Sequence, residues 1–255
     1  MLRWANKNKN YASLEAADIL SSRARHFFPE RDQPMIPREL LGTAIVPGGG
    51  EELRLFRRGK DHMIVLNRNE LMNSRMSGSE EALATMTIER LGSRDGHLLI
   101  GGYGMGFTLR ASCAALSPKG KMTVVELVPE IVTWAKGFMT EMTGDCLDDP
   151  RVDLVIGDVA DAIRAGEYDA ILLDVDNGPD GLTRDANDRL YSAHGLAAAK
   201  AALRPGGILA VWSAAPDRHF ARRLGEAGFA VDEVTLAARS NGKGPRHTIW
   251  FGQKR

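Results

Sequence analysis

The stretch from His97 to Phe107 most constrains what this chain can fold into. It reads His-Leu-Leu-Ile-Gly-Gly-Tyr-Gly-Met-Gly-Phe, an apolar run that breaks into alternating glycines and then into helix-forming sequence. This order is typical of a buried strand, a tight turn and a helix N-terminus, and glycines there accept positive φ and leave no Cβ between the main chain and a ligand. A second apolar run ends on Glu126, at the distance where an acid can hold both hydroxyls of a ribose. The pattern predicts an adenosine-type nucleoside site.

From His97 onward, segments typical of strands alternate with segments typical of helices. We expect strands near 97–101, 121–126, 152–156, 169–174 and 207–212, and helices near 107–116, 128–141, 159–165, 186–203 and 216–227. Such alternation predicts an α/β fold with a doubly wound, mostly parallel sheet. The segments 230–236 and 247–252 leave no room for a helix between them, so we expect an antiparallel hairpin that completes a seven-stranded sheet.

The part of the chain before this core has a different pattern. Between residues 37 and 73, three short apolar runs (43–46, 53–57 and 62–66) are divided by turn signals. This pattern predicts a three-stranded antiparallel sheet, which is too small to be stable alone and must pack against a larger part of the protein. A helix is expected from Ser77 or Ser79 through Leu91, with acids in its first turn. We therefore expect three parts: an N-terminal extension over 1–36, a small β domain with its connecting helix over 37–92, and a nucleoside-binding catalytic domain over 93–255.

Composition excludes several classes of function. Acidic and basic residues balance at 33 each among 255 residues. The chain therefore has no net charge that would attract nucleic acid or a membrane surface. No run approaches the roughly 18 apolar residues of a membrane span, and charged residues interrupt any signal-peptide core near the N-terminus. Residues 13–28 could form one amphipathic helix, so the extension is either a docking helix or a disordered leader. The two cysteines, Cys113 and Cys146, cannot form a disulfide framework and have no metal-ligand spacing, which predicts a cytoplasmic protein with buried or half-buried thiols and no metal.

Acidic side chains follow two of the expected strands. Asp158 comes just after the third strand, where it either accepts a hydrogen bond from an adenine amino group or simply caps the next helix. Asp174, Asp176 and Asn177 leave the fourth strand together. Turn chemistry explains Asn177 and its successors but does not require Asp174. Because crowded, partly desolvated acids have raised pKa values, Asp174 and Asp176 are the candidate general bases.

Other side chains have weaker claims on the site. Tyr191 either lines the acceptor pocket or covers the sheet, and Trp134 fits core packing better than a cofactor wall. The histidines are scattered singly and are interpreted as structural. Basic residues in the small sheet fit a solvated face, with an anionic acceptor as the alternative. They are Arg54, Arg57, Arg58, Lys60 and Arg68.

Taken together, five stretches resemble the spermidine synthases, the polyamine aminopropyltransferases. The resemblance extends from about Leu53 to the C-terminus. The stretches are Leu98–Gly106, Val124–Glu130, Asp148–Val152 leading to Gly157-Asp158, Tyr168–Asp174 and Leu203–Gly207.

The resemblance implies a class I methyltransferase fold behind a small N-terminal β domain, and a homodimer. It also implies roles at the nucleoside site, with the loop glycines cradling the donor, Glu126 on the ribose and Asp158 on the adenine. Asp174 would be the base that frees an acceptor amine for attack on a sulfonium carbon. Independently of the resemblance, Asp176, Asn177 and Tyr191 are the candidates for contact with the acceptor. The loop glycines are Gly101, Gly102, Gly104 and Gly106.

The chain departs from this family at three places that concern the polyamine side. Gly104 stands where such synthases carry the aspartate that holds the donor's amino group, and the run Ser79-Glu80-Glu81 replaces a tyrosine-histidine-glutamate run. Glu70 stands near a position where the family has a glutamine. An amine-anchoring carboxylate matters because an unpaired buried ammonium is costly. We therefore expect a transferase with S-adenosylmethionine or its decarboxylated form as donor and a small-molecule acceptor. Methyl transfer is favoured over aminopropyl transfer, and a non-catalytic nucleoside-binding relative is the third hypothesis.

Overall fold

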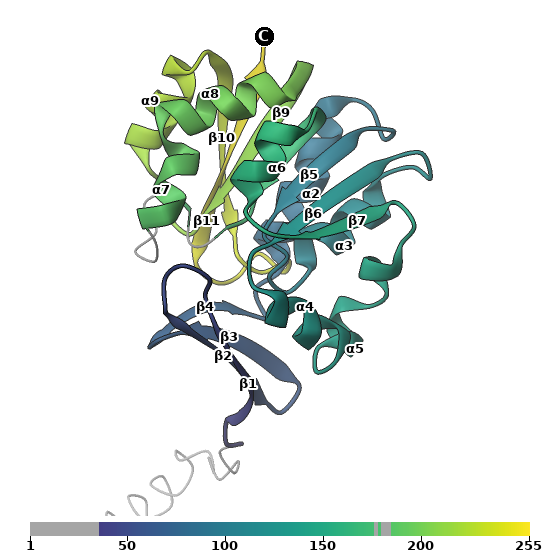
Figure 1. Ribbon diagram of the computed structural model, residues 1–255, viewed down its shortest axis with the longest axis vertical. Helices are drawn as coiled ribbons and strands as arrows, with labels where there is room; N and C mark the ends of the chain where they lie inside the picture. The colour runs from purple at the N-terminus through teal and green to yellow at the C-terminus, as the bar shows by residue number, and fades with distance from the viewer. Residues whose placement is uncertain (1–35, 176–177, 180–184) are drawn as a thin grey trace, which may run out of the picture. The chain divides into compact units, whose positions relative to one another are not determined.

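A computed structural model describes residues 36–175, 178–179 and 185–255 of the chain. Residues 37–255 form one compact unit, which contains both of the sheets described below. The two sheets and their helices are shown in Figure 1.

The smaller sheet is antiparallel and has four strands in the order β1-β2-β3-β4. Its strands are β1 (Glu39–Ile45), β2 (Glu52–Arg58), β3 (Asp61–Leu66) and β4 (Asn69–Asn73). The prediction of three strands was therefore wrong by one. The pattern hid β4 because only Leu71 and Met72 of its five residues are apolar, although the strand pairs with β3 from one end to the other.

The larger sheet has seven strands and is mostly parallel, which confirms the predicted α/β class. Its strands are β5 (His97–Gly101), β6 (Lys121–Glu126), β7 (Val152–Ile156), β8 (Tyr168–Leu173), β9 (Leu203–Ser213), β10 (Phe229–Ala237) and β11 (Arg246–Lys254). Strands β5 to β9 pair in parallel, while β11 pairs antiparallel with both β9 and β10. The expected C-terminal hairpin is thus present at the sheet edge.

Strand order places the ligand crevice. The order is β10-β11-β9-β8-β5-β6-β7, so the chain leaves β5 toward one side of the sheet and returns to its other side at β8. In open α/β sheets, ligands bind beyond the carboxyl ends of the strands at such a switch point. Here the segments that follow β5, β6, β7 and β8 begin with Gly102, Leu127, Gly157 and Asp174.

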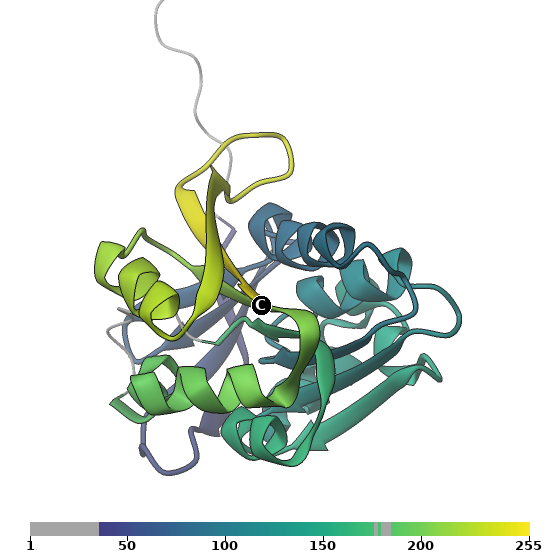
Figure 2. The same ribbon diagram turned by 90° about the horizontal axis from the view of Figure 1, so that it is seen from above.

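Helices cover both faces of the large sheet (Figure 2). On one face lie α2 (Gly78–Leu91), α3 (Phe107–Ala115) and α4 (Pro129–Lys136), whose apolar side chains share a core with the small sheet. On the other face lie α6 (Val159–Ala165), α7 (Asp185–Tyr191), α8 (Ala193–Ala202) and α9 (Arg218–Glu226). The short helices α5 (Thr140–Thr143) and η1 (Cys146–Asp148) lead from α4 to β7.

Two expected helices are interrupted in the structure. The helix expected over 128–141 divides into α4 and α5, because Gly137 ends α4. The helix expected over 186–203 divides into α7 and α8, where Ser192 caps α8 by accepting the Gly195 N–H. Within the described ranges, no helix is long and apolar enough to cross a membrane.

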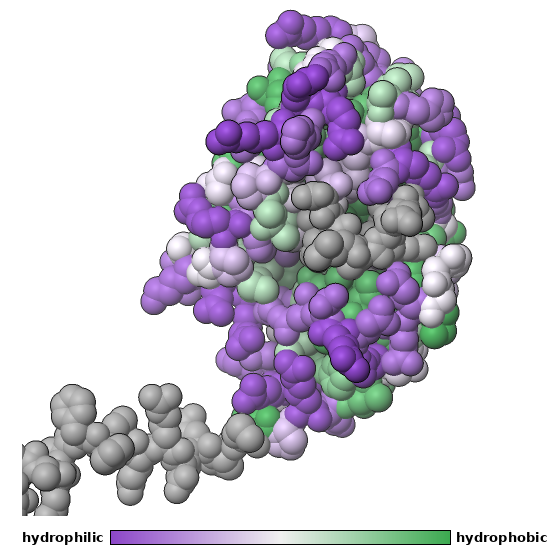
Figure 3. Space-filling model, turned by 90° about the vertical axis from the view of Figure 1, so that its left-hand side faces the viewer, coloured by the Kyte–Doolittle hydropathy of each residue, from purple (hydrophilic) through white to green (hydrophobic). Residues whose placement is uncertain are grey.

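The side of the molecule shown in Figure 3 is largely hydrophilic, with hydrophobic surface concentrated in its lower half, at the level of the small sheet. Exposed apolar residues of that sheet include Leu40 and Ile45, which are 53% and 58% exposed. Both lie on β1, an edge strand of the small sheet.

Candidate active site

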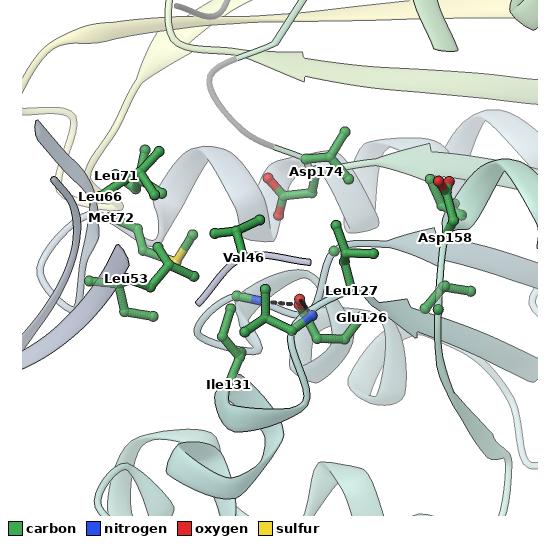
Figure 4. Close-up of a pocket in the computed structure, with 18 residues that line it drawn as sticks. Val46, Leu53, Leu66, Leu71, Met72, Glu126, Leu127, Ile131, Asp158 and Asp174 are labelled. Atoms are coloured by element: carbon green, nitrogen blue, oxygen red, sulfur yellow. Dashed lines mark hydrogen bonds between the residues drawn. The ribbon is translucent and has the colours of Figure 1, made fainter. Parts of the chain in front are cut away.

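A cavity lies at the carboxyl ends of β5, β6, β7 and β8, and the small sheet forms its far wall (Figure 4). Five residues predicted from the sequence for the nucleoside and acceptor sites line it. They are Gly102, Gly104, Glu126, Asp158 and Asp174. Figure 4 shows Leu53, Leu66, Leu71 and Met72 at the left of the cavity and Asp158 at the right. Asp174 and Glu126 lie between them.

The glycine loop leaves bare main chain at the cavity. Gly102 and Gly104 have φ values of 86° and 55°, in the left-handed region that favours glycine. A Cβ at Gly102 would collide with the carbonyl oxygen of Asp174, and a Cβ at Gly104 would lie 3.1 Å from the Met72 sulfur. The loop is thus a cradle that a side chain would fill, as a closely bound nucleoside requires.

Glu126 ends β6 and is buried, with both carboxylate oxygens turned toward the glycine loop and the start of α4. Oε2 accepts the Tyr103 N–H at 2.9 Å and the Gly104 N–H at 3.4 Å, while Oε1 accepts the Val128 N–H at 2.9 Å. Burial raises the pKa of Glu126, and the backbone donors oppose that rise. Since an ionised carboxylate has about four acceptor sites, capacity remains for a ligand hydroxyl.

Asp158 caps a helix and also lines the cavity. Its Oδ1 accepts the Ala160 N–H at 2.8 Å, which caps α6, and its Oδ2 pairs with Arg189 of α7. The same residue belongs to the cavity lining. Capping therefore does not remove Asp158 from the site, and its contact with an adenine stays a prediction.

Asp174 directly follows β8, where its N–H donates to the Gly101 carbonyl at 2.9 Å. Its Oδ2 accepts a 2.7 Å hydrogen bond from the Thr108 hydroxyl on α3. Burial raises the pKa of Asp174, and the Thr108 hydrogen bond opposes the rise. A half-buried carboxyl with a raised pKa that faces a cavity can accept a proton near neutral pH.

Glu80, in the first turn of α2, interacts with Asp174. Burial is the main cause that raises the pKa of Glu80, and the negative charge of Asp174 is the next. The Ser79 hydroxyl donates to Glu80 Oε2 at 2.6 Å and lies 2.8 Å from His247 Nδ1. Because both acids resist ionisation, one of the two holds a proton over part of the neutral range.

The remaining predicted site residues lie outside this arrangement or outside the described residues. Asp176 and Asn177 are not among the residues that the structure describes. Gly101 and Gly106 are not part of the cavity lining. A Cβ there would meet Val159 and the Tyr103 hydroxyl, respectively. Tyr191 is buried, packs edge-on against Phe220 with ring centroids 5.6 Å apart, and is not part of the cavity lining. Its contacts are those of a residue that covers the sheet, and an acceptor role for Tyr191 stays a prediction.

Packing accounts for the aromatic and histidine side chains that the sequence singled out. Trp134 is buried between α4 and the small sheet. His97 lies 3.0 Å from the Thr123 hydroxyl and packs edge-on against Tyr168. In the small sheet, Arg57 pairs with Glu39 at 2.7 Å and Arg54 with Glu52 at 3.4 Å, as expected for a solvated face.

Sequence reasoning missed Glu80, Thr108 and Met72 as members of the site. Glu80 carried a signal, because it belongs to the run Ser79-Glu80-Glu81, which stands where the resembling family has a tyrosine-histidine-glutamate run. Thr108 and Met72 carried none: each is an ordinary helix or strand residue until the fold brings it to Asp174 or Gly104.

Comparison with known proteins supports the relationship suggested by the motifs. The polyamine aminopropyltransferase of Korarchaeum cryptofilum is 32% identical over 135 residues, which are 52% of this chain and 40% of the relative. Putrescine N-methyltransferase 1 of Nicotiana tabacum is 37% identical over 115 residues, which are 44% of this chain and 28% of the relative. The chain thus matches less than half the length of either relative.

The fold has a counterpart among solved structures. The crystal structure of spermidine synthase in complex with the transition state analogue AdoDATO matches with a TM-score of 0.68 at 18% identity, over 85% of this chain and 72% of that one. A likeness at this identity concerns the fold. The family model described as the spermine/spermidine synthase domain matches residues 76–220, from two residues before α2 into α9. Because this match covers more than half of the chain, the protein belongs to the spermine/spermidine synthase domain family.

Proposed function

We propose that this protein is a transferase that takes a sulfonium nucleoside of the S-adenosylmethionine type as donor and transfers its methyl group to a small amine. The observation that carries the proposal is one cavity lined by the bare glycine loop, Glu126, Asp158 and Asp174. Glu126 would hold the ribose, Asp158 the adenine, and Gly102 and Gly104 would let the main chain approach the donor. When bound, the sulfonium supplies a carbon activated for displacement.

Asp174 is the proposed general base. Its carboxylate takes a proton from the acceptor ammonium, which leaves a neutral amine with a free electron pair. That pair forms the new nitrogen–carbon bond while the electrons of the broken carbon–sulfur bond go to sulfur, so the products are a substituted ammonium and a neutral thioether. Holding donor and acceptor in line supplies much of the rate acceleration.

Methyl transfer is preferred because the loop offers no carboxylate for a donor amine. Gly104 stands at the position of the family's anchoring acid, and Met72 occupies the space next to it. The similarity to a protein called putrescine N-methyltransferase is consistent with this choice. Aminopropyl transfer from decarboxylated S-adenosylmethionine is the second candidate, favoured by the similarity to a polyamine aminopropyltransferase and by the fold shared with spermidine synthase. The predicted homodimer and cytoplasmic location stay predictions.

Calorimetry with both donors, followed by mass spectrometry of the released nucleoside, tests the proposal. We expect S-adenosylmethionine to bind better and S-adenosylhomocysteine to accumulate with a mixture of small amines. Release of methylthioadenosine would instead establish aminopropyl transfer. Donor binding without any turnover would leave a nucleoside-binding relative, and no binding at millimolar concentration would refute the nucleoside site.

The variant Asp174→Asn tests the role of the base. We expect turnover to fall by at least about a hundredfold while donor affinity changes little, because a general base contributes that much and the donor contacts remain. Asp145→Asn is the matched control, since Asp145 is exposed and lies outside the cavity lining. Undiminished turnover in Asp174→Asn would remove Asp174 as the base.

A further inference from the structure

In the described lining of the cavity, all the charged side chains come from the large sheet and the segments that follow its strands, and the small sheet contributes only apolar side chains. We call the part of the lining that comes from the small sheet and its β1–β2 turn the apolar wall. It consists of Val46, Leu53, Ile64, Leu66, Leu71 and Met72. None of these side chains can pair with a charge. Asp158, the proposed adenine contact, lies on the side opposite Leu53, Leu66, Leu71 and Met72, and Glu126 and Asp174 lie between the two sides (Figure 4). The apolar wall therefore faces the part of the cavity left for the acceptor.

Few charged groups of the described lining are available to an acceptor. Its ionisable members are three carboxylates, and it contains no lysine, arginine or histidine. Glu126 is held by backbone N–H groups, and Asp158 caps α6 and pairs with Arg189. Among the described lining residues, Asp174 is then the carboxylate that can pair with a cationic acceptor, and an anionic acceptor would meet only charges of its own sign there.

Asp174 is suited to one ammonium group. Its Oδ2 accepts a hydrogen bond from the Thr108 hydroxyl, a neutral donor that leaves the charge of the carboxylate uncompensated. Glu80 adds a second carboxyl that interacts with Asp174, and their mutual repulsion is relieved when a cation arrives. One positive charge thus finds strong partners at this end of the acceptor space, whereas the apolar wall offers none at the other end.

We infer that the acceptor is an amine with one cationic centre and an apolar body, rather than a diamine or polyamine. The inference rests on the proposed function and adds the substrate class to it. The ammonium lies at Asp174, and the hydrocarbon part lies against Leu53, Leu66, Leu71 and Met72. A second ammonium placed against the apolar wall would find no partner among the described residues of the lining, which is costly for any desolvated charge.

A matched pair of probes tests this inference on the unmodified protein. Hexylamine and hexamethylenediamine have the same carbon chain and differ only in the second ammonium. Calorimetry is carried out on protein saturated with S-adenosylhomocysteine, or with methylthioadenosine if that nucleoside binds better. We expect hexylamine to bind at least about tenfold more tightly than the diamine. Equal or tighter binding of the diamine, or no binding of hexylamine at millimolar concentration, overturns the inference.

A charge placed on the apolar wall should change the preference. Leu71 is half-buried and accessible from the cavity, so Leu71→Glu puts a carboxylate where the second ammonium would lie. We expect Leu71→Glu to raise the affinity for hexamethylenediamine relative to hexylamine by about tenfold, and Leu71→Gln, of the same shape without the charge, to leave the ratio nearly unchanged. A folded Leu71→Glu variant with the ratio of the unmodified protein contradicts the inference. If Leu71→Glu does not fold, the probe comparison on the unmodified protein decides.

Failure of this inference differs from failure of the proposed function. If neither nucleoside binds, the proposed function is wrong. If a nucleoside binds and the diamine is preferred, the proposed function stands and only the single-charge acceptor is refuted.

Discussion

Glu80 illustrates how a single residue acquires its properties from the fold. It lies in the first turn of α2, where a helix N-terminus favours negative charge, and it accepts a 2.6 Å hydrogen bond from the Ser79 hydroxyl. Burial and the charge of Asp174 outweigh these effects and raise its pKa. Over the pH range between its unfolded and folded pKa values, the folded protein therefore binds more protons than the unfolded chain. Stability must fall as pH rises through that range.

Replacing Glu80 by glutamine should remove this pH dependence. The glutamine amide cannot ionise but can still accept from Ser79, so Glu80→Gln should melt a few degrees higher than the unmodified protein at pH 8, with the difference vanishing near pH 4. Thermal melts across this pH range provide the measurement. Glu81→Gln is the control, because Glu81 pairs with Arg110 at 3.1 Å and its loss should not raise the melting temperature at any pH. Parallel curves for Glu80→Gln and the unmodified protein would contradict the argument.

At the scale of one element, Arg151 fixes the end of α3. Its guanidinium donates to the carbonyls of Cys113, Leu116 and Ser117 at 2.7–3.1 Å, and to both carboxylate oxygens of Asp149. These carbonyls lie at the C-terminus of α3, where helix carbonyls lack partners and a cation is favoured. The N-terminus of the same helix carries Thr108, so Arg151 indirectly holds the partner of Asp174 in place.

A lysine at position 151 cannot make all of the hydrogen bonds that the Arg151 guanidinium donates. We expect Arg151→Lys to destabilise the protein by about 1–3 kcal/mol, because several half-buried carbonyls lose a charged donor. Arg222→Lys is the matched control: the Arg222–Glu226 pair is one helical turn apart and its arginine side chain is 78% exposed, so the same substitution should cost less than about 0.5 kcal/mol. Chemical denaturation measures both, and equal losses would show that the carbonyl contacts contribute nothing particular.

At the scale of the whole compact unit, the small sheet packs against α4 and forms one wall of the cavity. Gly42 of β1 and Trp134 of α4 lie at the contact between the small sheet and α4, where a Cβ added to Gly42 would lie 2.6 Å from the indole nitrogen. Such a distance requires the indole or the strand to move. Since the same sheet supplies the apolar wall, a shift there changes the cavity as well as stability.

Alanine at position 42 should therefore reduce both stability and nucleoside affinity. We expect Gly42→Ala to lose about 1–3 kcal/mol of stability through overpacking, and Trp134→Phe in the same chain to recover part of the loss by removing the indole nitrogen. Gly225→Ala is the control, because no atom lies within 4 Å of its added Cβ and alanine is the better helix former, so that variant should be stabilised. Denaturation and donor calorimetry measure the two effects, and additive losses in the double variant would contradict the proposed contact.

The sequence was sufficient for the parts of this protein that rest on local patterns. Apolar runs of strand length, the glycines after β5, the acid that ends β6 and the acids after β7 and β8 are each readable within a few residues, and the alternation of elements implied the parallel sheet. Because parallel strands share one carboxyl edge, that alternation also implied that Gly102, Glu126, Asp158 and Asp174 would meet, and all four line the same cavity.

Only the tertiary structure decided which distant segments complete the site. The polar strand β4 forms by pairing with β3, Glu80 becomes an unusual acid by burial beside Asp174, and the wall opposite the proposed nucleoside side is apolar because the small sheet packs there. Arg151 likewise reaches α3 from a distant part of the sequence. These properties come from long-range packing, in which burial and neighbouring charge set the chemistry of a side chain. The glycine loop therefore indicates the class of donor, whereas the surfaces brought against it by folding determine what acceptor it can meet.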